Sequence, residues 1–206
     1  MRTAIFGGTF DPVHSAHLEM ARRAADQFRL DRVLFIPAGN PPHKQADASF
    51  EHRYRMVQLA CAADPRFIAS RLEEGAAKSY SIETIERVKA GSAEAAASAG
   101  AANGGVPHTA GNGALFFIIG SDAFAEIQSW RRWQDVIRAV EFIVVARPGY
   151  EIAGPPGAHV NRLDCAELPV SSSDIRDALA RGESPPELPP AIADYIRDHR
   201  LYGSVS

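Results

Sequence analysis

Residues 3–17 read TAIFGGTFDPVHSAH and contain, in order, an apolar run, a glycine turn and the start of an amphipathic helix. We expect Thr3–Phe6 to form a short strand that ends at Gly7-Gly8. From His17 to Phe28 the apolar residues recur at helical spacing, so a helix follows the turn. A strand, a glycine turn and a helix in this order are typical of the first unit of an α/β fold.

The rest of the chain continues this alternation of strands and helices. Apolar runs at 33–36, 67–70, 115–119 and 142–146 are expected to be strands. Helices are expected at 50–63, at 81–89 and in the stretch that holds Trp130 and Trp133. Runs that are apolar on both faces are typical of parallel strands buried between helix layers. The sequence therefore predicts a doubly wound parallel α/β sheet, with ligands bound at the carboxyl ends of its strands.

One segment differs from the rest in composition. The chain has 206 residues, 46% of them hydrophobic, which predicts a single domain over residues 1–206. Residues 91–113 read GSAEAAASAGAANGGVPHTAGNG and offer too little apolar area to offset their ordering entropy. We expect a flexible surface loop there, although the alanines could instead extend the preceding helix by a turn or two.

Charge and cysteine content bear on location and partners. The net charge of −3 excludes a broad basic surface, so neither nucleic acid nor an anionic membrane is an expected partner. Cys61 and Cys165 are the only cysteines, which fits free thiols in a reducing compartment. No apolar stretch is long enough for a membrane helix, and the N-terminus does not read as a signal peptide. We expect a cytoplasmic protein.

The glycine turn carries groups suited to an anion. Exposed amides at the start of the next helix favour a negative ligand, and His14 and His17, three residues apart, share one face of that helix. Their imidazoles can donate hydrogen bonds to phosphate oxygens. A tight turn with two surface histidines is the alternative. A metal site is not expected, since no third ligand completes H-x-x-H, and no dinucleotide or Walker fingerprint is present.

Two motifs together resemble the nucleotidyltransferase superfamily. GGTFDPVHSAH is similar to its G-x-F-x-P-x-H-x-x-H signature, whose histidines contact nucleotide phosphates. VSSSDIR, at 170–176, is similar to I-S-S-T-x-I-R, which opens a helix and binds the phosphates of ATP. Without a ligand these serines would only cap a helix. The resemblance implies a Rossmann-like nucleotidyltransferase fold with a small C-terminal helical part.

Further segments resemble the bacterial nicotinate-nucleotide adenylyltransferases. They are PAGNPPHK at 37–44, SYS at 79–81, GSD at 120–122, SWR at 129–131, RPG at 147–149 and the closing AIADYIRDHRLYG at 191–203. In the family the RPG turn follows the last strand of the sheet, so the resemblance implies that 142–146 is the last strand here. The chain departs from the pattern at Ala16, where glycine is usual, and at Ser173, where threonine is usual. Both histidines and the hydroxyl are kept, so the implied site stays intact.

The resemblance implies three groups of site residues. The catalytic residues are His14, His17 and Arg176. The ATP-binding residues are Gly7, Gly8, Thr9, Phe10, Asp122, Ser171, Ser172 and Ser173. The residues that bind the second substrate are His43, Lys44, Ser79, Tyr80, Ser81, Trp130 and Arg131. Lys44 could instead be a solvated loop lysine, and Trp130 a core residue. No residue is expected to ligate a metal, and Mg²⁺ would arrive with ATP.

The implied reaction is the transfer of the adenylyl group of ATP to nicotinate mononucleotide, which gives deamido-NAD and pyrophosphate in NAD biosynthesis. The partners are then ATP and nicotinate mononucleotide, while a homo-oligomer is left open. One alternative is a different acceptor, phosphopantetheine or nicotinamide mononucleotide. Another is a noncatalytic nucleotide sensor, which would keep the binding loops and lose turnover.

Overall fold

The structure is a computed structural model that describes residues 1–41, 46–97, 113–147, 149, 151–165 and 170–204. His43 and Lys44, expected to bind the second substrate, lie outside the described residues. Among the described residues, no helix is both long enough and apolar enough to cross a membrane.

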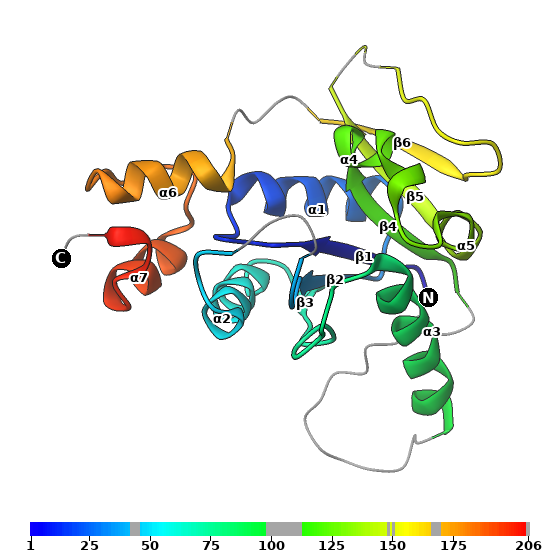
Figure 1. The fold of residues 1–206 in the computed structure, drawn as a ribbon, viewed down its shortest axis with the longest axis horizontal. Helices are drawn as coiled ribbons and strands as arrows, with labels where there is room; N and C mark the ends of the chain where they lie inside the picture. The colour runs from blue at the N-terminus through cyan, green and yellow to red at the C-terminus, as the bar shows by residue number, and fades with distance from the viewer. Residues whose placement is uncertain (42–45, 98–112, 148, 150, 166–169, 205–206) are drawn as a thin grey trace.

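A parallel sheet organises the described chain (Figure 1). Its six strands lie in the order β3-β2-β1-β4-β5-β6, and every neighbouring pair is parallel. The strands are β1 (Thr3–Gly8), β2 (Arg32–Pro37), β3 (Phe67–Ala69), β4 (Leu115–Gly120), β5 (Glu141–Ala146) and β6 (Val160–Asp164). The strand order reverses at β1 and β4, and such a switch point is where open α/β sheets bind ligands.

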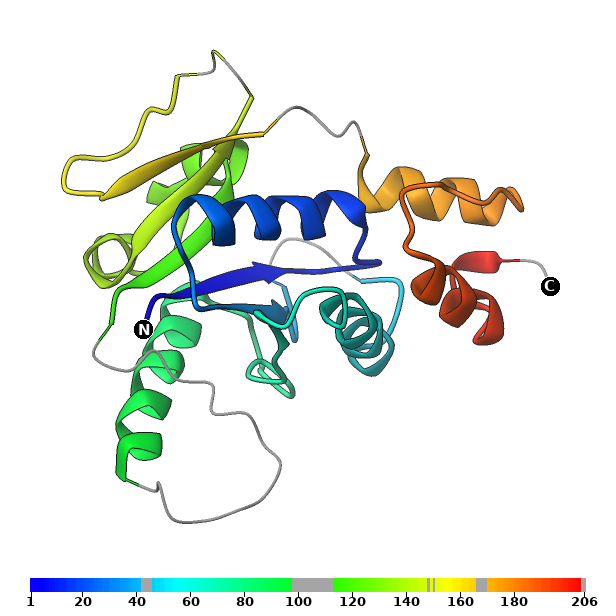
Figure 2. The ribbon, with the colours of Figure 1, turned by 180° about the vertical axis from the view of Figure 1, so that it is seen from behind.

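Helices cover both faces of this sheet. They are α1 (Ser15–Gln27), α2 (Phe50–Cys61), α3 (Ser81–Ala97), α4 (Ser121–Ala125), α5 (Trp133–Ala139), α6 (Ser172–Ala180) and α7 (Pro190–Asp198), with short 3₁₀ turns η1 (Ile127–Ser129) and η2 (Leu201–Gly203). In both ribbon views α6, α7 and the C-terminus lie together beside the start of α1 (Figures 1 and 2). The C-terminal segment therefore lies near the turn that follows β1.

The core consists of two clusters, one on each face of the sheet. In β2, Val33 and Phe35 pack in the cluster that includes residues of α1, α2, α6 and α7. Leu34 and Ile36 pack in the opposite cluster, with residues of α3, α4 and α5. Since successive strand residues point to opposite faces, an apolar run such as 33–36 fills both clusters at once. The predicted doubly wound, Rossmann-like fold is confirmed.

The structure differs from the expected elements in three places. The strand at 142–146 is not the last, because β6 follows it at the edge of the sheet with Leu163 its one fully buried residue. Trp130 is extended between η1 and α5 and shares no helix with Trp133. Helix α3 continues to Ala97, as in the alternative of a helix extended by the alanines. Residues 98–112 of the expected loop lie outside the described chain.

Candidate functional site

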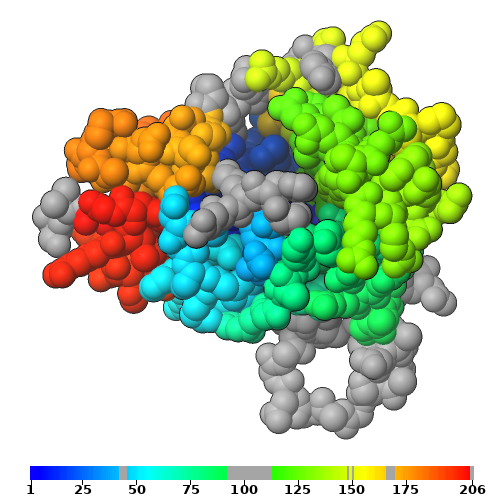
Figure 3. Space-filling model, viewed as in Figure 1, coloured from blue at the N-terminus to red at the C-terminus, as the bar shows by residue number. Residues whose placement is uncertain are grey.

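Two cavities open at the carboxyl ends of the strands and meet at Gly120, the last residue of β4, which lines both. The first cavity, about 270 Å³, is lined by the ends of β1, β2 and β4 together with Glu73, Ser79, Ser81, Thr84 and Trp130. The second cavity, about 370 Å³, is lined by residues that include His14, His17, Asp122, Arg147 and Ser171. In Figure 3, blue atoms of the N-terminal segment lie deep between α6 (orange) and the green segment around α4.

His14 and His17 stand at the start of α1 and line the second cavity together. His14 is the residue that precedes the helix, and its ring centroid lies 3.8 Å from that of His17. The backbone N–H of His14 donates to Nδ1 of His17 over 3.3 Å. Because Nδ1 of His17 is an acceptor, the proton of its neutral ring sits on Nε2. The other ring nitrogen of His17 is thus a donor.

His14 is held neutral by its surroundings. Its side chain is only 3% exposed, and burial lowers its pKa from 6.5 to about 4. Its Nδ1 has no hydrogen-bond partner among the described residues. Buried polar atoms are almost always paired, and the His14 side chain stands at the residue that precedes α1, where its ring also lines the second cavity.

Phe10 is buried in the core and packs against His17. It adopts a left-handed backbone (φ 50°) and is 2% exposed. Its ring packs edge-on against His17, with centroids 5.1 Å apart, and also against Phe6 and Phe35. Phe10 is expected from the sequence to bind ATP, but it is not among the residues that line either cavity. Gly7, Gly8 and Thr9 of the same turn do line the first cavity.

The three serines at the start of α6 differ in whether their hydroxyl hydrogen is already used in a hydrogen bond. Ser171 caps the helix, and its Oγ donates to Asp174 while accepting from the Asp174 backbone N–H. Ser172 Oγ donates to the Pro12 carbonyl over 3.0 Å. Ser173 Oγ only accepts, from Arg176, among the described residues. The hydroxyl hydrogen of Ser173 and the first amides of α6 are therefore the donors left for an anion.

Arg176 is fixed one turn along α6 by acceptors from two other segments. Its Nη1 donates to the Asp11 carbonyl over 2.8 Å, and its Nε pairs with the Asp47 carboxylate. Its Nη2 donates to Ser173 Oγ over 3.3 Å. A guanidinium has five N–H donors, so further ones remain for an anion. Arg176 thus joins α6 to the turn after β1.

Arg53 is a buried charged neighbour of the turn after β1, and its position was not expected from the sequence. Its side chain is 2% exposed, with Nε donating to the Ala48 carbonyl and Nη1 to the Thr9 carbonyl. Burial lowers its pKa, and the charge of Asp11 partly offsets this effect. Arg53 shares the buried face of α2 with Met56 and Val57. A charged residue on an otherwise apolar helix stripe is the signal that could have identified it.

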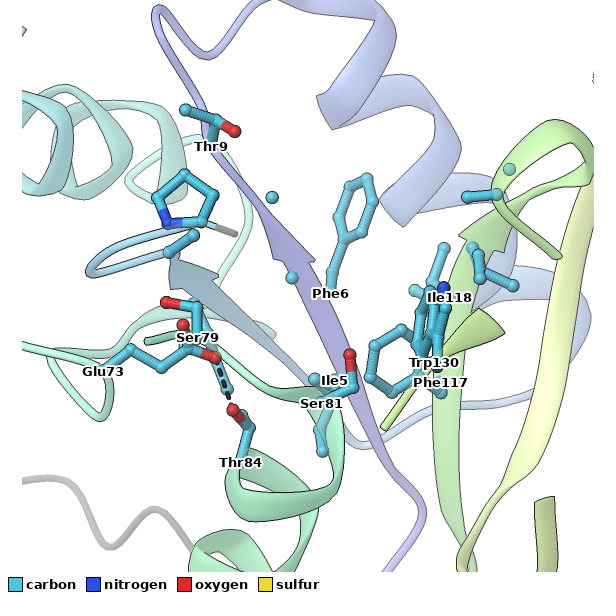
Figure 4. Close-up of a pocket in the computed structure, with 18 residues that line it drawn as sticks. Ile5, Phe6, Thr9, Glu73, Ser79, Ser81, Thr84, Phe117, Ile118 and Trp130 are labelled. Carbon is cyan, nitrogen blue, oxygen red and sulfur yellow. Dashed lines mark hydrogen bonds between the residues drawn. The ribbon is translucent and has the colours of Figure 1, made fainter. Parts of the chain in front are cut away.

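The first cavity has one polar wall, shown on the left of Figure 4. Thr84 on α3 donates a hydrogen bond to the buried carboxylate of Glu73, which also accepts the Gly39 N–H over 3.4 Å. A Cβ on residue 39 would lie 1.9 Å from the Glu73 carbonyl, so only glycine fits there. Ser79 Oγ accepts the Asn40 N–H over 3.0 Å. These contacts tie the turn after β2 to the start of α3. Sequence reasoning missed Glu73 as well.

The opposite wall is aromatic. Trp130 and Phe117 lie side by side on the right of Figure 4, with ring centroids 6.0 Å apart in an edge-on arrangement. Ser81, the first residue of α3, also lines this cavity. Tyr80 and Arg131 form a cation–π pair at 4.7 Å and are not among the residues that line the cavity. Of the residues expected to bind the second substrate, the structure brings Ser79, Ser81 and Trp130 together.

Relatives of known family share this sequence along its whole length. A family model described as Cytidylyltransferase-like matches residues 5–178. A relative from Solibacter usitatus (strain Ellin6076), named "Probable nicotinate-nucleotide adenylyltransferase", is 53% identical over 98% of this chain and 100% of its own. One of the same name from Leifsonia xyli subsp. xyli (strain CTCB07) is 37% identical over 100% of this chain and 96% of its own.

The fold is similar to solved structures of much lower sequence identity. "Plasmodium falciparum nicotinic acid mononucleotide adenylyltransferase complexed with NaAD" superposes with a TM-score of 0.72 at 18% identity, over 98% of this chain and 97% of that one. The structure of the same enzyme complexed with APC superposes with a TM-score of 0.71 at 18% identity, over 98% of this chain and 96% of that one. At this identity the likeness concerns the fold.

Proposed function

Because this chain belongs to the cytidylyltransferase-like family, and within it to the nicotinate-nucleotide adenylyltransferases, we propose that it transfers the adenylyl group of ATP to nicotinate mononucleotide. The products are deamido-NAD and pyrophosphate, a step of NAD biosynthesis. The observation that carries this proposal is the pair of cavities that meet at Gly120, with His14 and His17 lining one of them.

ATP occupies the second cavity in this proposal. Its phosphates lie between the His14–His17 pair and Ser171 at the start of α6. The two phosphates that leave as pyrophosphate extend beyond the cavity lining to Arg176 and the Ser173 hydroxyl, which lie one turn apart on α6. Asp122, in the first turn of α4, lines the same cavity and accepts hydrogen bonds from the ribose hydroxyls. The helix N-terminus adds its partial positive charge to these contacts.

Nicotinate mononucleotide occupies the first cavity. Trp130 stacks on the pyridine ring, an arrangement favoured by about 1 kcal/mol. The hydroxyl of Ser81 and the first amides of α3 hold the ring carboxylate, because a helix N-terminus favours a negative group. We assign His43 and Lys44 to its phosphate on resemblance alone, because both lie outside the described residues.

The reaction needs positioning and charge stabilisation rather than an activated protein nucleophile. A phosphate oxygen of nicotinate mononucleotide attacks the α-phosphorus of ATP, forming the new P–O bond as the bond to the β-phosphate oxygen breaks. The leaving pyrophosphate carries the displaced electron pair and is stabilised by Arg176 and Ser173. His17 donates its Nε2–H to the α-phosphate, where charge builds up in the transition state.

Mg²⁺ reaches the site bound to ATP. Among the described residues, no group of three His, Cys, Asp or Glu side chains is placed to hold a metal ion. ATP phosphates are the usual ligands for Mg²⁺, which retains several waters, and the ion neutralises phosphate charge during transfer. We propose a cytoplasmic location, for which the support is that Cys61 and Cys165 are both unpaired and buried.

A comparison of acceptors tests this function. Purified protein with ATP and Mg²⁺ is offered nicotinate mononucleotide, nicotinamide mononucleotide or phosphopantetheine, and pyrophosphate release is followed. We expect the highest kcat/KM with nicotinate mononucleotide. A higher kcat/KM with another acceptor would reassign the substrate. ATP binding without release for any acceptor would indicate a noncatalytic sensor.

A further inference from the structure

The last turn of the chain reaches the turn that precedes His14. Tyr202 lies in η2, after α7, and its hydroxyl donates to Oδ1 of Asp11 over 2.7 Å across 191 residues of sequence. Asp11 is only 3% exposed. A hydrogen bond to a buried carboxylate is among the stronger ones in proteins, so this contact fixes both ends.

Asp11 connects Tyr202 to the groups assigned to ATP. Its Oδ2 accepts the Asp47 N–H over 2.7 Å and its Oδ1 accepts the Ala48 N–H over 3.1 Å. Its backbone carbonyl accepts from Arg176 over 2.8 Å. The next carbonyl, of Pro12, accepts from Ser172 at the start of α6. A shift of Asp11 would therefore move both the turn before His14 and the guanidinium of Arg176.

The backbone around Tyr202 is specialised for this contact. Arg200, Tyr202 and Gly203 all have positive φ, at 50°, 59° and 71°. Left-handed backbone is uncommon at non-glycine residues and persists only where the surrounding structure compensates for it. Here the chain turns sharply after α7, and η2 packs against α6. This sharp turn brings the Tyr202 hydroxyl within hydrogen-bond distance of Asp11.

The charges around the pair keep Tyr202 a donor. Burial and the adjacent Asp11 carboxylate raise the pKa of Tyr202 well above its ordinary value. The nearby guanidinium groups of Arg176 and Arg53 act in the opposite direction on the pKa of Tyr202. The phenol is therefore protonated throughout the physiological range and bonds to Asp11 in the folded enzyme.

We propose that Tyr202 is a positioning residue for ATP, which acts through Asp11 to hold His14 and Arg176 in the arrangement that binds the triphosphate. This inference rests on the proposed function, because it assumes that ATP lies in the second cavity. Tyr202 itself touches no substrate: it lines neither cavity. Its loss should weaken the use of ATP more than the binding of the acceptor, because Asp11 holds Arg176 directly whereas the first cavity is lined by residues earlier in the turn, up to Thr9.

Tyr202→Phe removes only the hydroxyl, and Tyr195→Phe is its matched control. Tyr195, on α7, donates or accepts a hydrogen bond with Nδ1 of His52 over 3.0 Å, away from both cavities. We expect Tyr202→Phe to lower kcat/KM for ATP about tenfold, the effect of one charge-assisted hydrogen bond. In Tyr202→Phe the KM for nicotinate mononucleotide should change less than about twofold. In Tyr195→Phe the KM values for both ATP and nicotinate mononucleotide should change less than about twofold.

A second readout separates positioning from stability. Each variant is assayed well below its midpoint of thermal unfolding, and binding of a nonhydrolysable ATP analogue is measured by calorimetry. A merely structural hydrogen bond would lower the midpoint of Tyr202→Phe and leave its kinetics and analogue affinity at wild-type values, which overturns the proposal. An equal rise in both KM values would also overturn it.

If Tyr202→Phe does not stay folded, Asp11→Asn is measured in the same way, because the amide keeps an acceptor oxygen and loses the charge. The same selective loss towards ATP is expected, and unchanged ATP kinetics would contradict the proposal. A wild-type enzyme that turns over no acceptor would refute the proposed function, whereas analogue affinity still decides the role of Tyr202.

Discussion

His14 and His17 face each other at 3.8 Å between ring centroids, and the backbone N–H of the first donates to Nδ1 of the second. Two positive charges so close would repel each other, and burial lowers the pKa of His14 to about 4, so that its ring is neutral at pH 7. In the proposed function the pair donates hydrogen bonds to phosphate, and the tautomer of His17 is fixed by the backbone N–H of His14. The consequences can be tested separately for each ring.

Loss of the His17 ring should impair chemistry more than binding. We expect His17→Ala to lower kcat at least about 10²-fold, because the donor to the α-phosphate acts where charge develops in the transition state. Pyrophosphate release at saturating substrates measures this effect. His159→Ala is the control, because His159 is exposed and lines neither cavity. Turnover near the wild-type value in His17→Ala would remove this residue from the chemistry.

Burial of His14 makes stability depend on pH. In the folded protein its pKa is about 4, below the unfolded value of 6.5, so between these pH values the unfolded chain binds more protons. The free energy of unfolding therefore includes a contribution from neutral His14 that is present in full above pH 6.5 and is lost as the pH falls towards 4. This contribution amounts to roughly 2 to 3 kcal/mol between pH 7 and pH 4.5.

Urea unfolding of wild type and His14→Asn at these two pH values isolates that contribution. The free energy of unfolding of the variant should fall less on acidification, by the amount assigned to His14. His159→Asn should keep the wild-type dependence, since its ring is exposed. Parallel pH dependences in wild type and His14→Asn would mean that His14 titrates alike in both states.

The sheet could be predicted largely from its apolar runs, and the exception is instructive. Strands such as 115–119 are buried on both faces, so their sequence is continuously apolar. β6, VNRLD, lies at the edge of the sheet with one buried side chain, and its polar residues give no such signal. The end of α3 was ambiguous because alanine favours a helix whereas the following glycines do not.

The proximity of residues held by one local motif could be predicted, whereas pairings made through tertiary contacts could not. His14 and His17 are adjacent on one helix turn, so their spacing brings them together. Phe10 belongs to the same motif but packs inward, which its backbone conformation decides. Asp11 finds its partner Tyr202 at the other end of the chain, and Glu73 finds Thr84 on another element. No local pattern encodes such pairings.

The Thr84–Glu73 contact should matter for the acceptor rather than for ATP. Thr84→Val keeps the shape and removes the donor, so the buried carboxylate keeps only the Gly39 N–H among the described groups. We expect a loss of about 1 to 3 kcal/mol in the free energy of unfolding and a several-fold higher KM for nicotinate mononucleotide. Thr84→Ser retains the hydroxyl and should behave like wild type. A selective rise in the KM for ATP would contradict this assignment.

Trp130 should report directly on the acceptor. The chain contains two tryptophans, so Trp133→Phe leaves Trp130 as the only one. Stacking of the pyridine ring predicts that nicotinate mononucleotide quenches the fluorescence of this variant. Trp130→Phe is the matched control and should respond much less, because Trp133 begins α5 and lines neither cavity. Trp130→Ala should raise the KM for nicotinate mononucleotide about fivefold, in line with roughly 1 kcal/mol of stacking. Equal quenching in the two single-tryptophan variants would place the ring elsewhere.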